Sequence, residues 1–153
     1  MNAPAPPRFQ PQDPDFAARV RASFERQAAM RHIGARLTRI EPGRTEIELD
    51  YRDELTQQKG YMHGGIIGMI ADSACGYAAY TLMPATSSLV TVEYKINLLA
   101  PAVGNVLHAG GEVLKPGRSL SITRGEVRTD QGVLVAIMQQ TLMMLPDTPD
   151  APD

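Results

Sequence analysis

The sequence predicts an α+β fold in which a curved antiparallel sheet wraps around one long buried helix, with an extra helix on the N-terminal side. Three observations support this prediction. The segment from His63 to Met83 is apolar on nearly every side of a helical wheel. Two strand-like runs precede this segment, and four follow it. Because a helix that is apolar all round must be buried, a sheet curved around it is the economical architecture.

The length and composition of the chain predict a single domain. With 153 residues, 43% of them hydrophobic, the chain can build one substantial core but not two. Proline and polar residues predominate in residues 1–14 and 146–153, so we expect disordered tails there. The domain is therefore expected to span residues 15–145.

The N-terminal third is expected to contain a helix and a β-hairpin. Phe16, Val20 and Phe24 recur four residues apart, which predicts an amphipathic helix over residues 15–30. Strand-like runs over residues 34–40 and 45–51 flank the turn-forming residues 41–43. This pattern is typical of a hairpin with one buried face and one wet face.

The remainder is expected to contain the long helix and four strands. Residues 52–61 have the composition of a loop, and the helix is predicted to begin at Gly64 and to end near Pro84. Apolar residues then alternate from Val90 to Leu98, and further strands are predicted over 105–115, 119–129 and 133–145. Because the three connectors have hairpin composition, we expect these strands to form an antiparallel meander.

Charge and composition argue against several partners. The formal net charge is -2 and acids and bases are mixed along the chain, so no basic face predicts nucleic-acid binding.

The single cysteine, Cys75, cannot form an internal disulfide and lies in the apolar segment, which indicates a small core residue. The first residues lack the features of a secretory signal, so we expect a cytoplasmic protein. The segment 63–83 contains Asp72 and several glycines, which favours a buried helix over a membrane span.

Asp72 is the first candidate site residue, because it is the only formally charged residue between His63 and Glu93. Burying an unpaired carboxylate costs several kcal/mol, so an apolar helix that carries one is expected to use it. The alternative is a structural carboxylate that caps a strand or pairs with an arginine.

The sequence His63-Gly64-Gly65 is the second candidate, because it lies where the long helix is predicted to start. The first amides of a helix have no internal partner, and glycines let a substrate oxygen approach them closely. This arrangement is typical of an oxyanion hole. The alternative is that the two glycines only permit a tight entry into a crowded helix.

The spacing of these two candidates predicts a dimer. Gly64 and Asp72 are eight residues apart, so about 12 Å separates them along one helix at ~1.5 Å per residue. One carbonyl group cannot contact both, since a reacting carbon must lie within about 3 Å of both kinds of group. The site is therefore expected to combine two copies of the helix.

The segment from Gln57 to Gly65, the helix that carries Asp72, the run LVTVEYKINLLAPAVG and the sequence KPGR together resemble the PaaI-like family of hotdog-fold acyl-CoA thioesterases. The resemblance extends from about Met30 to Leu145. It implies hydrolysis of an acyl-CoA to a carboxylic acid and free CoA, with no dissociable cofactor because CoA is part of the substrate. It also implies active sites between subunits of a homodimer or homotetramer.

The resemblance gives roles to several residues. Asp72 would attack the thioester carbon or activate a water, while the Gly64 amide of the partner subunit holds the carbonyl oxygen. Gln57 matches a position that orients water or the thioester, although a solvent-facing loop residue is the alternative. Thr91 matches a hydroxyl position near the carboxylate, or is an ordinary strand residue. His63 is expected to position the site rather than to transfer protons.

The remaining candidates concern binding. Gly65 is expected to contact substrate beside Gly64. The resemblance favours Lys115 and Arg118 of the KPGR turn as contacts for the CoA phosphates, with Arg124 and Arg128 as further candidates, although basic residues at a hairpin tip are usually only solvated. His32 and His108 lack acidic or cysteine partners at ligand spacing, so no metal is expected.

Two other functions compete with the thioesterase hypothesis. A hotdog hydratase or dehydratase would need a histidine and a carboxylate facing one acyl group, but His63 and Asp72 lie too far apart along one helix. A noncatalytic acyl-CoA-binding or sensing protein would keep the fold without turnover. An added DNA-binding helix pair would be its mark, and the sequence predicts none.

Overall fold

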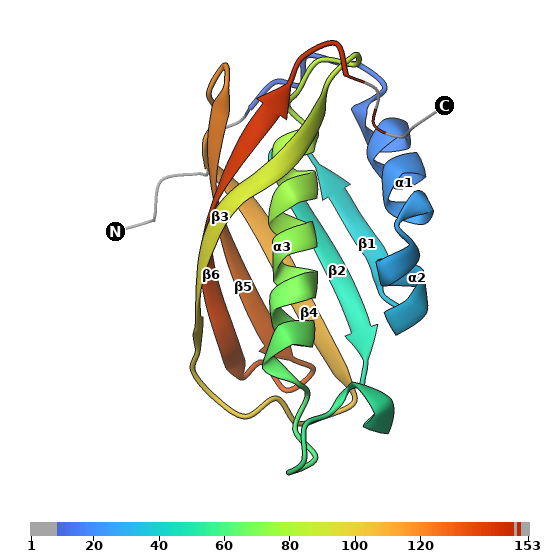
Figure 1. The fold of residues 1–153 in the computed structure, drawn as a ribbon, viewed down its shortest axis with the longest axis vertical. Helices are drawn as coiled ribbons and strands as arrows, with labels where there is room; N and C mark the ends of the chain where they lie inside the picture. The colour runs from blue at the N-terminus through green and yellow to red at the C-terminus, as the bar shows by residue number, and fades with distance from the viewer. Residues whose placement is uncertain (1–8, 149, 151–153) are drawn as a thin grey trace.

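The computed structural model describes residues 9–148 and 150, and it confirms the predicted α+β architecture. Six antiparallel strands form one sheet in the order β1-β2-β4-β5-β6-β3, and the long helix α3 lies across one face of this sheet (Figure 1). The helices are α1 (Phe16–Arg26), α2 (Ala28–Ile33) and α3 (Gly64–Tyr80), with a short 3-10 turn η1 (Asp53–Leu55). The strands are β1 (Arg36–Glu41), β2 (Arg44–Asp50), β3 (Ser88–Leu98), β4 (Val106–Lys115), β5 (Leu120–Thr129) and β6 (Leu134–Leu145).

The order of the strands corrects the predicted meander. β4, β5 and β6 do follow one another, but β3 pairs with β6 at the edge of the sheet, and β4 pairs with β2. Residues 99–105 therefore cross past two strands instead of forming a hairpin. The crossing segment is held by Leu99 N, which donates to Val135 O over 2.7 Å, and by Ala102 O, which accepts from Met62 N over 3.2 Å. Proline and glycine mark a change of direction but do not specify which strand comes next in the sheet.

The N-terminal helix is shorter than predicted, because the chain breaks at Gln27. Gln27 has an extended conformation, so the predicted helix over 15–30 becomes α1 and α2. The predicted apolar stripe is confirmed in α1, where Val20 and Phe24 are buried. The break redirects α2 so that Met30 and Ile33 are also buried. Figure 1 shows both helices beside β1, at the side of the molecule away from β3.

The centre of α3 is seated directly on the sheet, because two glycines leave space for it. A Cβ at Gly111 of β4 would lie 2.4 Å from the carbonyl oxygen of Ala74, and a Cβ at Gly125 of β5 would lie 2.9 Å from Cys75 Sγ. Cys75 is fully buried, as the sequence predicted, and burial raises the pKa of its thiol to about 12. This close approach fixes the depth of α3 two residues beyond Asp72.

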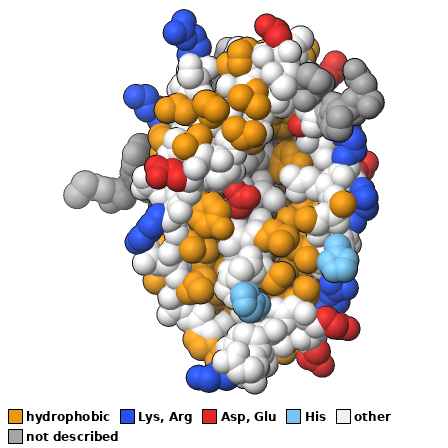
Figure 2. Space-filling model, viewed as in Figure 1, with side chains coloured by type: hydrophobic (Ala, Val, Ile, Leu, Met, Phe, Trp, Pro, Cys, Tyr) orange, Lys and Arg blue, Asp and Glu red, His pale blue; other side chains and the backbone are white. Residues whose placement is uncertain are grey.

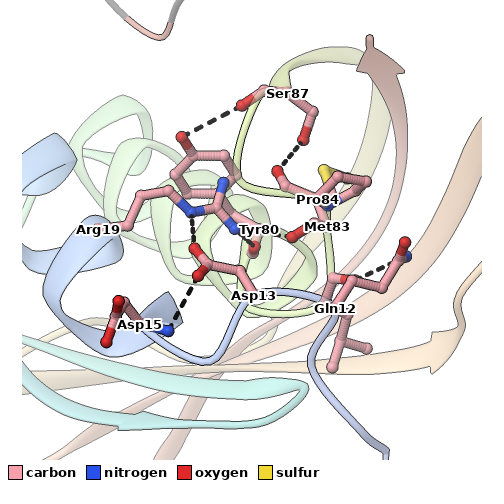
Figure 3. A network of polar contacts seen from close by, with 9 residues as sticks. Gln12, Asp13, Asp15, Arg19, Tyr80, Met83, Pro84 and Ser87 are labelled. Carbon is pink, nitrogen blue, oxygen red and sulfur yellow. Dashed lines mark hydrogen bonds and ion pairs between the residues drawn. The ribbon is translucent and has the colours of Figure 1, made fainter. Parts of the chain in front are cut away.

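The C-terminal end of α3 is held by Arg19 of α1 (Figure 3). The guanidinium donates to Tyr80 O over 3.2 Å and to Met83 O over 2.8 Å, and it lies 4.1 Å from the centre of the Tyr80 ring. It also pairs with the buried carboxylate of Asp13 at 2.7 Å. A cation at this end of a helix also interacts favourably with the helix dipole.

Residues 9–14 lie within the segment where the sequence predicted a tail, whereas the structure gives them defined contacts. Asp13 is bound to Arg19, and Gln12 Nε2 donates to Leu82 O over 3.0 Å (Figure 3). The rest of the predicted tails, residues 1–8, 149 and 151–153, falls outside the described residues. Within the described part of the chain, no helix is both long enough and apolar enough to cross a membrane.

A β-bulge in β3 changes the predicted alternation of that strand. The pairing with β6 shifts between Thr91 and Glu93, so Val92 is an extra residue. Thr91 pairs opposite the buried Leu142, and Tyr94 pairs opposite the buried Gln140. Because paired residues share a face of the sheet, Thr91 and Tyr94 both face α3. The predicted single apolar face from Val90 to Leu98 is therefore split at Val92.

Candidate active site

Asp72 lies in the middle of α3, on the side of the helix that faces the edge strand β3. It is half-buried and lines an open cavity of about 390 Å³ between α1, α3 and β3. Ser73, Gly76 and Tyr77 of α3, Ser23 of α1 and Leu89 of β3 also line this cavity. The isolated acid that the sequence singled out therefore reaches a space that can hold a ligand.

Two polar side chains from the sheet hold one oxygen of Asp72. Thr91 Oγ1 of β3 donates to Asp72 Oδ1 over 2.8 Å, and Gln140 Nε2 of β6 donates to the same oxygen. Gln140 Nε2 also lies 2.9 Å from Thr91 Oγ1, which closes a three-membered network. The expectation that the Thr91 hydroxyl lies near the carboxylate agrees with this geometry.

Gln140 is the member of this network that the sequence reasoning missed. It is fully buried on the face of β6 that carries Met138 and Leu142. A signal was present, because alternation along β6 puts this one polar residue among apolar residues of the inward face. Its neighbour Gln139 faces outward and is exposed. The sequence alone does not show which of these two adjacent glutamines is buried.

The other oxygen of Asp72, Oδ2, is free. Across residues 9–148 and 150, no group donates a hydrogen bond to Oδ2, and this atom is not among the buried polar atoms that lack a partner. The carboxylate thus has one anchored oxygen and one accessible oxygen. Such an oxygen can act on a bound carbonyl carbon or on a water molecule.

The N-terminal end of α3 is capped by its own histidine. His63 Nδ1 accepts a hydrogen bond from Gly65 N over 2.9 Å, and His63 O accepts from Ile66 N and Ile67 N. This geometry requires an unprotonated Nδ1, which fits a positioning role for His63 rather than proton transfer. The Gly65 amide is engaged within the chain, so its expected contact with substrate stays a prediction.

The Gly64 amide is the first free donor of α3. It has no hydrogen-bond acceptor among the described residues, and Gly64 is half-buried. A Cβ at this position would lie 2.8 Å from Leu98 Cδ1, so the exposed side chain of Leu98 borders this amide. A helix start with a free amide and partial positive charge can stabilise an oxyanion.

Gly64 and Asp72 lie on one unbroken helix, as predicted. α3 continues from Gly64 to Tyr80, and His63 is its N-cap. Eight residues of helix therefore separate the free amide from the carboxylate, which is about 12 Å of rise. Within one chain, the two groups cannot contact the same carbonyl.

The structure does not bring Gln57 into the cavity that Asp72 lines. The side-chain oxygen of Gln57 accepts a hydrogen bond from Lys59 N, and the backbone N–H of Gln57 donates to Tyr61 O over 2.8 Å, so Gln57 stabilises the loop before α3. It is not among the residues that line the cavity. Its expected role toward water or the thioester stays a prediction.

The basic residues of the KPGR turn also lie apart from this cavity. Lys115 and Arg118 are exposed at the β4–β5 hairpin, and neither lines the cavity. Arg124 and Arg128 lie on the outer face of the sheet, where both form ion pairs with Glu126. The basic residue at the rim of the cavity is Arg26 of α1, which pairs with Asp150. Nothing in the sequence distinguishes Arg26 from the other charged residues of its helix.

The far wall of the cavity carries aromatic rings and hydroxyl groups. Tyr77 OH lies 3.2 Å from Ser23 Oγ, and burial raises the pKa of Tyr77 to about 12. The rings of Phe24 and Tyr77 pack edge to face with their centres 5.7 Å apart. Tyr80 continues the wall toward the end of α3. The cavity therefore offers a ligand both apolar contacts and hydroxyl groups.

Within the described residues, no three His, Cys, Asp or Glu side chains are grouped so that they could hold a metal ion together.

Comparisons of the sequence and of the fold with known proteins point to the same family. The sequence profile of the thioesterase superfamily matches residues 59–136. A thioesterase family protein from Silicibacter pomeroyi has a solved structure that is similar at a TM-score of 0.83 and 42% identity, over 86% of this chain and 98% of the other. The PaaI protein of E. coli, from the phenylacetic acid degradation operon, is similar at a TM-score of 0.81 and 19% identity, over 88% of this chain and 96% of the other. The 1,4-dihydroxy-2-naphthoyl-CoA hydrolase of Listeria monocytogenes is 23% identical over 110 residues, which are 72% of this chain and 89% of that protein.

Proposed function

Because the chain belongs to the thioesterase superfamily, it is a thioester hydrolase with a PaaI-like hotdog fold, and we propose that its substrates are acyl-CoA thioesters. The reaction consumes one water, breaks the bond between the acyl carbon and the sulfur, and releases a carboxylic acid and free CoA. The observation that carries this proposal is the free Oδ2 of Asp72 at the wall of a cavity. No dissociable cofactor takes part, since CoA is part of the substrate.

The shape and lining of the cavity support an acyl group as its occupant. A volume of about 390 Å³ is within the range of small-molecule sites. Leu89 and the rings of Tyr77 and Tyr80 offer apolar contacts beside Asp72. The Listeria monocytogenes relative, whose name identifies a CoA thioester as its substrate, supports the same class of substrate.

Asp72 can act in either of two ways that the geometry allows. As a nucleophile, Oδ2 attacks the thioester carbon and expels the CoA thiolate, which leaves a mixed anhydride that water hydrolyses. As a general base, Oδ2 takes a proton from a water, which attacks the same carbon and expels the thiolate. Both routes give the same products, and both need the carbonyl oxygen to be stabilised.

The group that stabilises the carbonyl oxygen is the Gly64 amide of a second copy of the chain. Within one chain, this amide lies about 12 Å from Asp72 along the helix, which is too far for both to act on one carbonyl. Two copies of α3 that run in opposite directions bring the start of each helix to the middle of the other. The proposed site therefore needs a homodimer, and a homotetramer would pair two such dimers.

The surface that supports this dimer is the open face around β3. β3 is an edge strand, and its apolar side chains are exposed, with 55% of Val92 and 54% of Leu98 accessible. Figure 2, drawn from the side that shows α3 and β3, shows hydrophobic side chains gathered on this face. Natural proteins cover exposed apolar edge strands, and this one lies beside both Asp72 and Gly64.

Replacement of Asp72 by Asn tests the proposed function. The measurement is the release of free thiol from a panel of acyl-CoA thioesters by the purified protein. We expect kcat to fall by at least about a hundredfold for the best substrate, because the amide cannot act as base or nucleophile. The control variant Glu112→Gln removes an exposed acid from the outer face of the sheet and is expected to keep full activity. Undiminished turnover by Asp72→Asn would reject the proposal, and tight binding of acyl-CoA without turnover by the natural protein would support a sensor instead.

A single-turnover reaction in heavy-oxygen water can identify the nucleophilic route. With excess enzyme, attack of water on the Asp72 carbonyl of the mixed anhydride leaves heavy oxygen in the Asp72 carboxylate, whereas attack on the acyl carbonyl leaves it in the released acid. A general base leaves Asp72 unlabelled and puts the label only in the released acid. Heavy oxygen in the peptide that contains Asp72, detected by mass spectrometry, therefore establishes the nucleophilic route.

A further inference from the structure

We infer that Gln140 is a positioning residue for the proposed reaction, and that it holds the Asp72 carboxylate so that Oδ2 faces the substrate. This inference rests on the proposed function of Asp72. Gln140 lies on β6, which belongs to the sheet rather than to α3, and it is separated from Asp72 by 68 residues in sequence. The contact between them therefore depends on the tertiary fold.

The burial of Gln140 requires that its amide find partners. Only 1% of Gln140 is exposed, and its inward-facing neighbours on β6 are Met138 and Leu142. A buried amide without hydrogen bonds costs several kcal/mol, so an apolar side chain would serve packing better unless the amide had a use. Among the residues that the structure describes, no other glutamine is buried.

The partners of Gln140 fix which way its amide points. A carboxylate only accepts hydrogen bonds, so the NH2 group must face Asp72 Oδ1, and the oxygen Oε1 must face away. The Thr123 hydroxyl, 3.4 Å from Oε1, is the donor on that side. The second N–H of the amide points to Thr91 Oγ1 at 2.9 Å. Thr91 accepts this bond and donates its own hydroxyl hydrogen bond to Asp72 Oδ1, so both N–H groups of the Gln140 amide and the Thr91 O–H each have an acceptor.

This arrangement orients the carboxylate without neutralising it. Both donors bind Oδ1, which opposes rotation of the carboxylate and leaves Oδ2 directed at the cavity. An arginine or lysine at the same position would pair with the carboxylate and reduce its ability to attack or to accept a proton. A neutral amide donates the same kind of hydrogen bond but adds no charge. Gln140 thus suits a carboxylate that must remain reactive.

The test replaces Gln140 by Met, which has nearly the same length and shape but cannot hydrogen-bond. We expect kcat to fall about ten- to a hundredfold, the range for loss of a hydrogen bond to a charged group. KM is expected to change by less than about threefold, because the lost bond orients the reactive group and does not hold the substrate. The matched control is Gln139→Met, which makes the same change one residue earlier on the exposed face. It is expected to keep the natural kcat and KM.

A second comparison separates positioning from loss of structure. In an Asp72→Asn background, Gln140→Met is expected to change the residual rate by less than about twofold, because its effect acts through the carboxylate. A general loss of structure would lower that residual rate as well. If Gln140→Met gives too little folded protein, Gln140→Glu keeps every heavy-atom position and brings a second carboxylate to Asp72, and we expect an equal or larger loss of kcat.

The possible outcomes distinguish this inference from the proposed function. An active Asp72→Asn variant rejects the proposed function. An inactive Asp72→Asn variant together with a folded and fully active Gln140→Met variant rejects only the role of Gln140. Equal losses in Gln140→Met and Gln139→Met would also reject it, because the two residues differ only in the face of β6 that they occupy.

Discussion

The two halves of α3 differ in how the rest of the molecule holds them. The C-terminal half, from Ala74 to Tyr80, is seated against Gly111 and Gly125, and its end is fastened by Arg19. The N-terminal half, from Gly64 to Asp72, buries its back against the sheet but leaves its front open beside the exposed side chains of β3. One helix thus combines a fixed half and an open half.

We expect this difference to separate the groups that stabilise the fold from those that serve the proposed activity. Groups that contact the C-terminal half fix the depth and direction of the helix, so changes there are expected to reduce stability first. Groups around the N-terminal half contribute little burial, since the side chains of Tyr94 and Leu98 are exposed. Changes there are expected to alter association and turnover while the fold is kept. Three substitutions test this contrast between the two halves of α3.

The largest effect on stability is expected from Gly111→Ala. The added Cβ would lie 2.4 Å from backbone atoms of Ala74 and 2.5 Å from Cys75 N, and backbone atoms cannot rotate away. We expect a loss of about 3 kcal/mol in the free energy of unfolding, measured by chemical denaturation. Gly110→Ala is the matched control, because its Cβ would meet nothing within 4 Å. A stability change within about 1 kcal/mol is expected for Gly110→Ala. Equal losses in both variants would contradict the close packing of α3 against Gly111.

A smaller loss is expected from Arg19→Met at the end of α3. This change leaves the Asp13 carboxylate buried without its cation and frees the carbonyls of Tyr80 and Met83. Breaking a buried ion pair costs several kcal/mol, but Arg19 is partly exposed, so we expect about 2 kcal/mol. The exposed Arg21 of the same helix offers the control, Arg21→Met, with no measurable effect. The thermal unfolding midpoints of the two variants give the comparison. An unchanged midpoint for Arg19→Met would contradict the proposal that Arg19 stabilises the end of α3.

The smallest effect on folding is expected from Leu98→Lys on the open side. Because Leu98 is exposed, its replacement is expected to change the free energy of unfolding by less than about 0.5 kcal/mol. The molecular mass in solution is nevertheless expected to fall from that of an oligomer to that of a monomer, and turnover is expected to fall with it. Leu114→Lys, an equally exposed leucine of β4, should leave both unchanged. A Leu98→Lys variant that stays oligomeric by light scattering would exclude this face as the contact.

The parts of the fold that depend on local patterns could be predicted from the sequence. The apolar segment around Asp72 predicted α3, and residues 34–51 predicted the first hairpin, because periodicity and turn residues are encoded locally. The pairing of β3 with β6 could not be predicted, since turn composition does not specify which strands become neighbours. The break at Gln27 was also missed, because nothing near it has the composition of a helix end.

The contacts of the candidate site were predictable only where one residue stands out from its neighbours in sequence. Asp72 was found because no other charge lies near it in sequence, and Thr91 was found through the resemblance to a known family. Gln140 was missed because its importance depends on the face of β6 that it occupies, and Gln139 beside it concealed that face. The self-capping of α3 by His63 depends on a side-chain rotamer, which no spacing predicts.

The bulge at Val92 limits which changes in length β3 can accept. Because Val92 is an extra residue, its deletion would leave a regular strand in which Thr91, Glu93 and Tyr94 still pair opposite Leu142, Thr141 and Gln140 and keep their faces. A residue deleted or inserted beyond the bulge would instead turn the later residues of β3 to the opposite face, so that Asn97 would point at the helix and Leu98 away from it. The number of residues between Glu93 and Leu98 is therefore under stricter constraint than the identity of most of them.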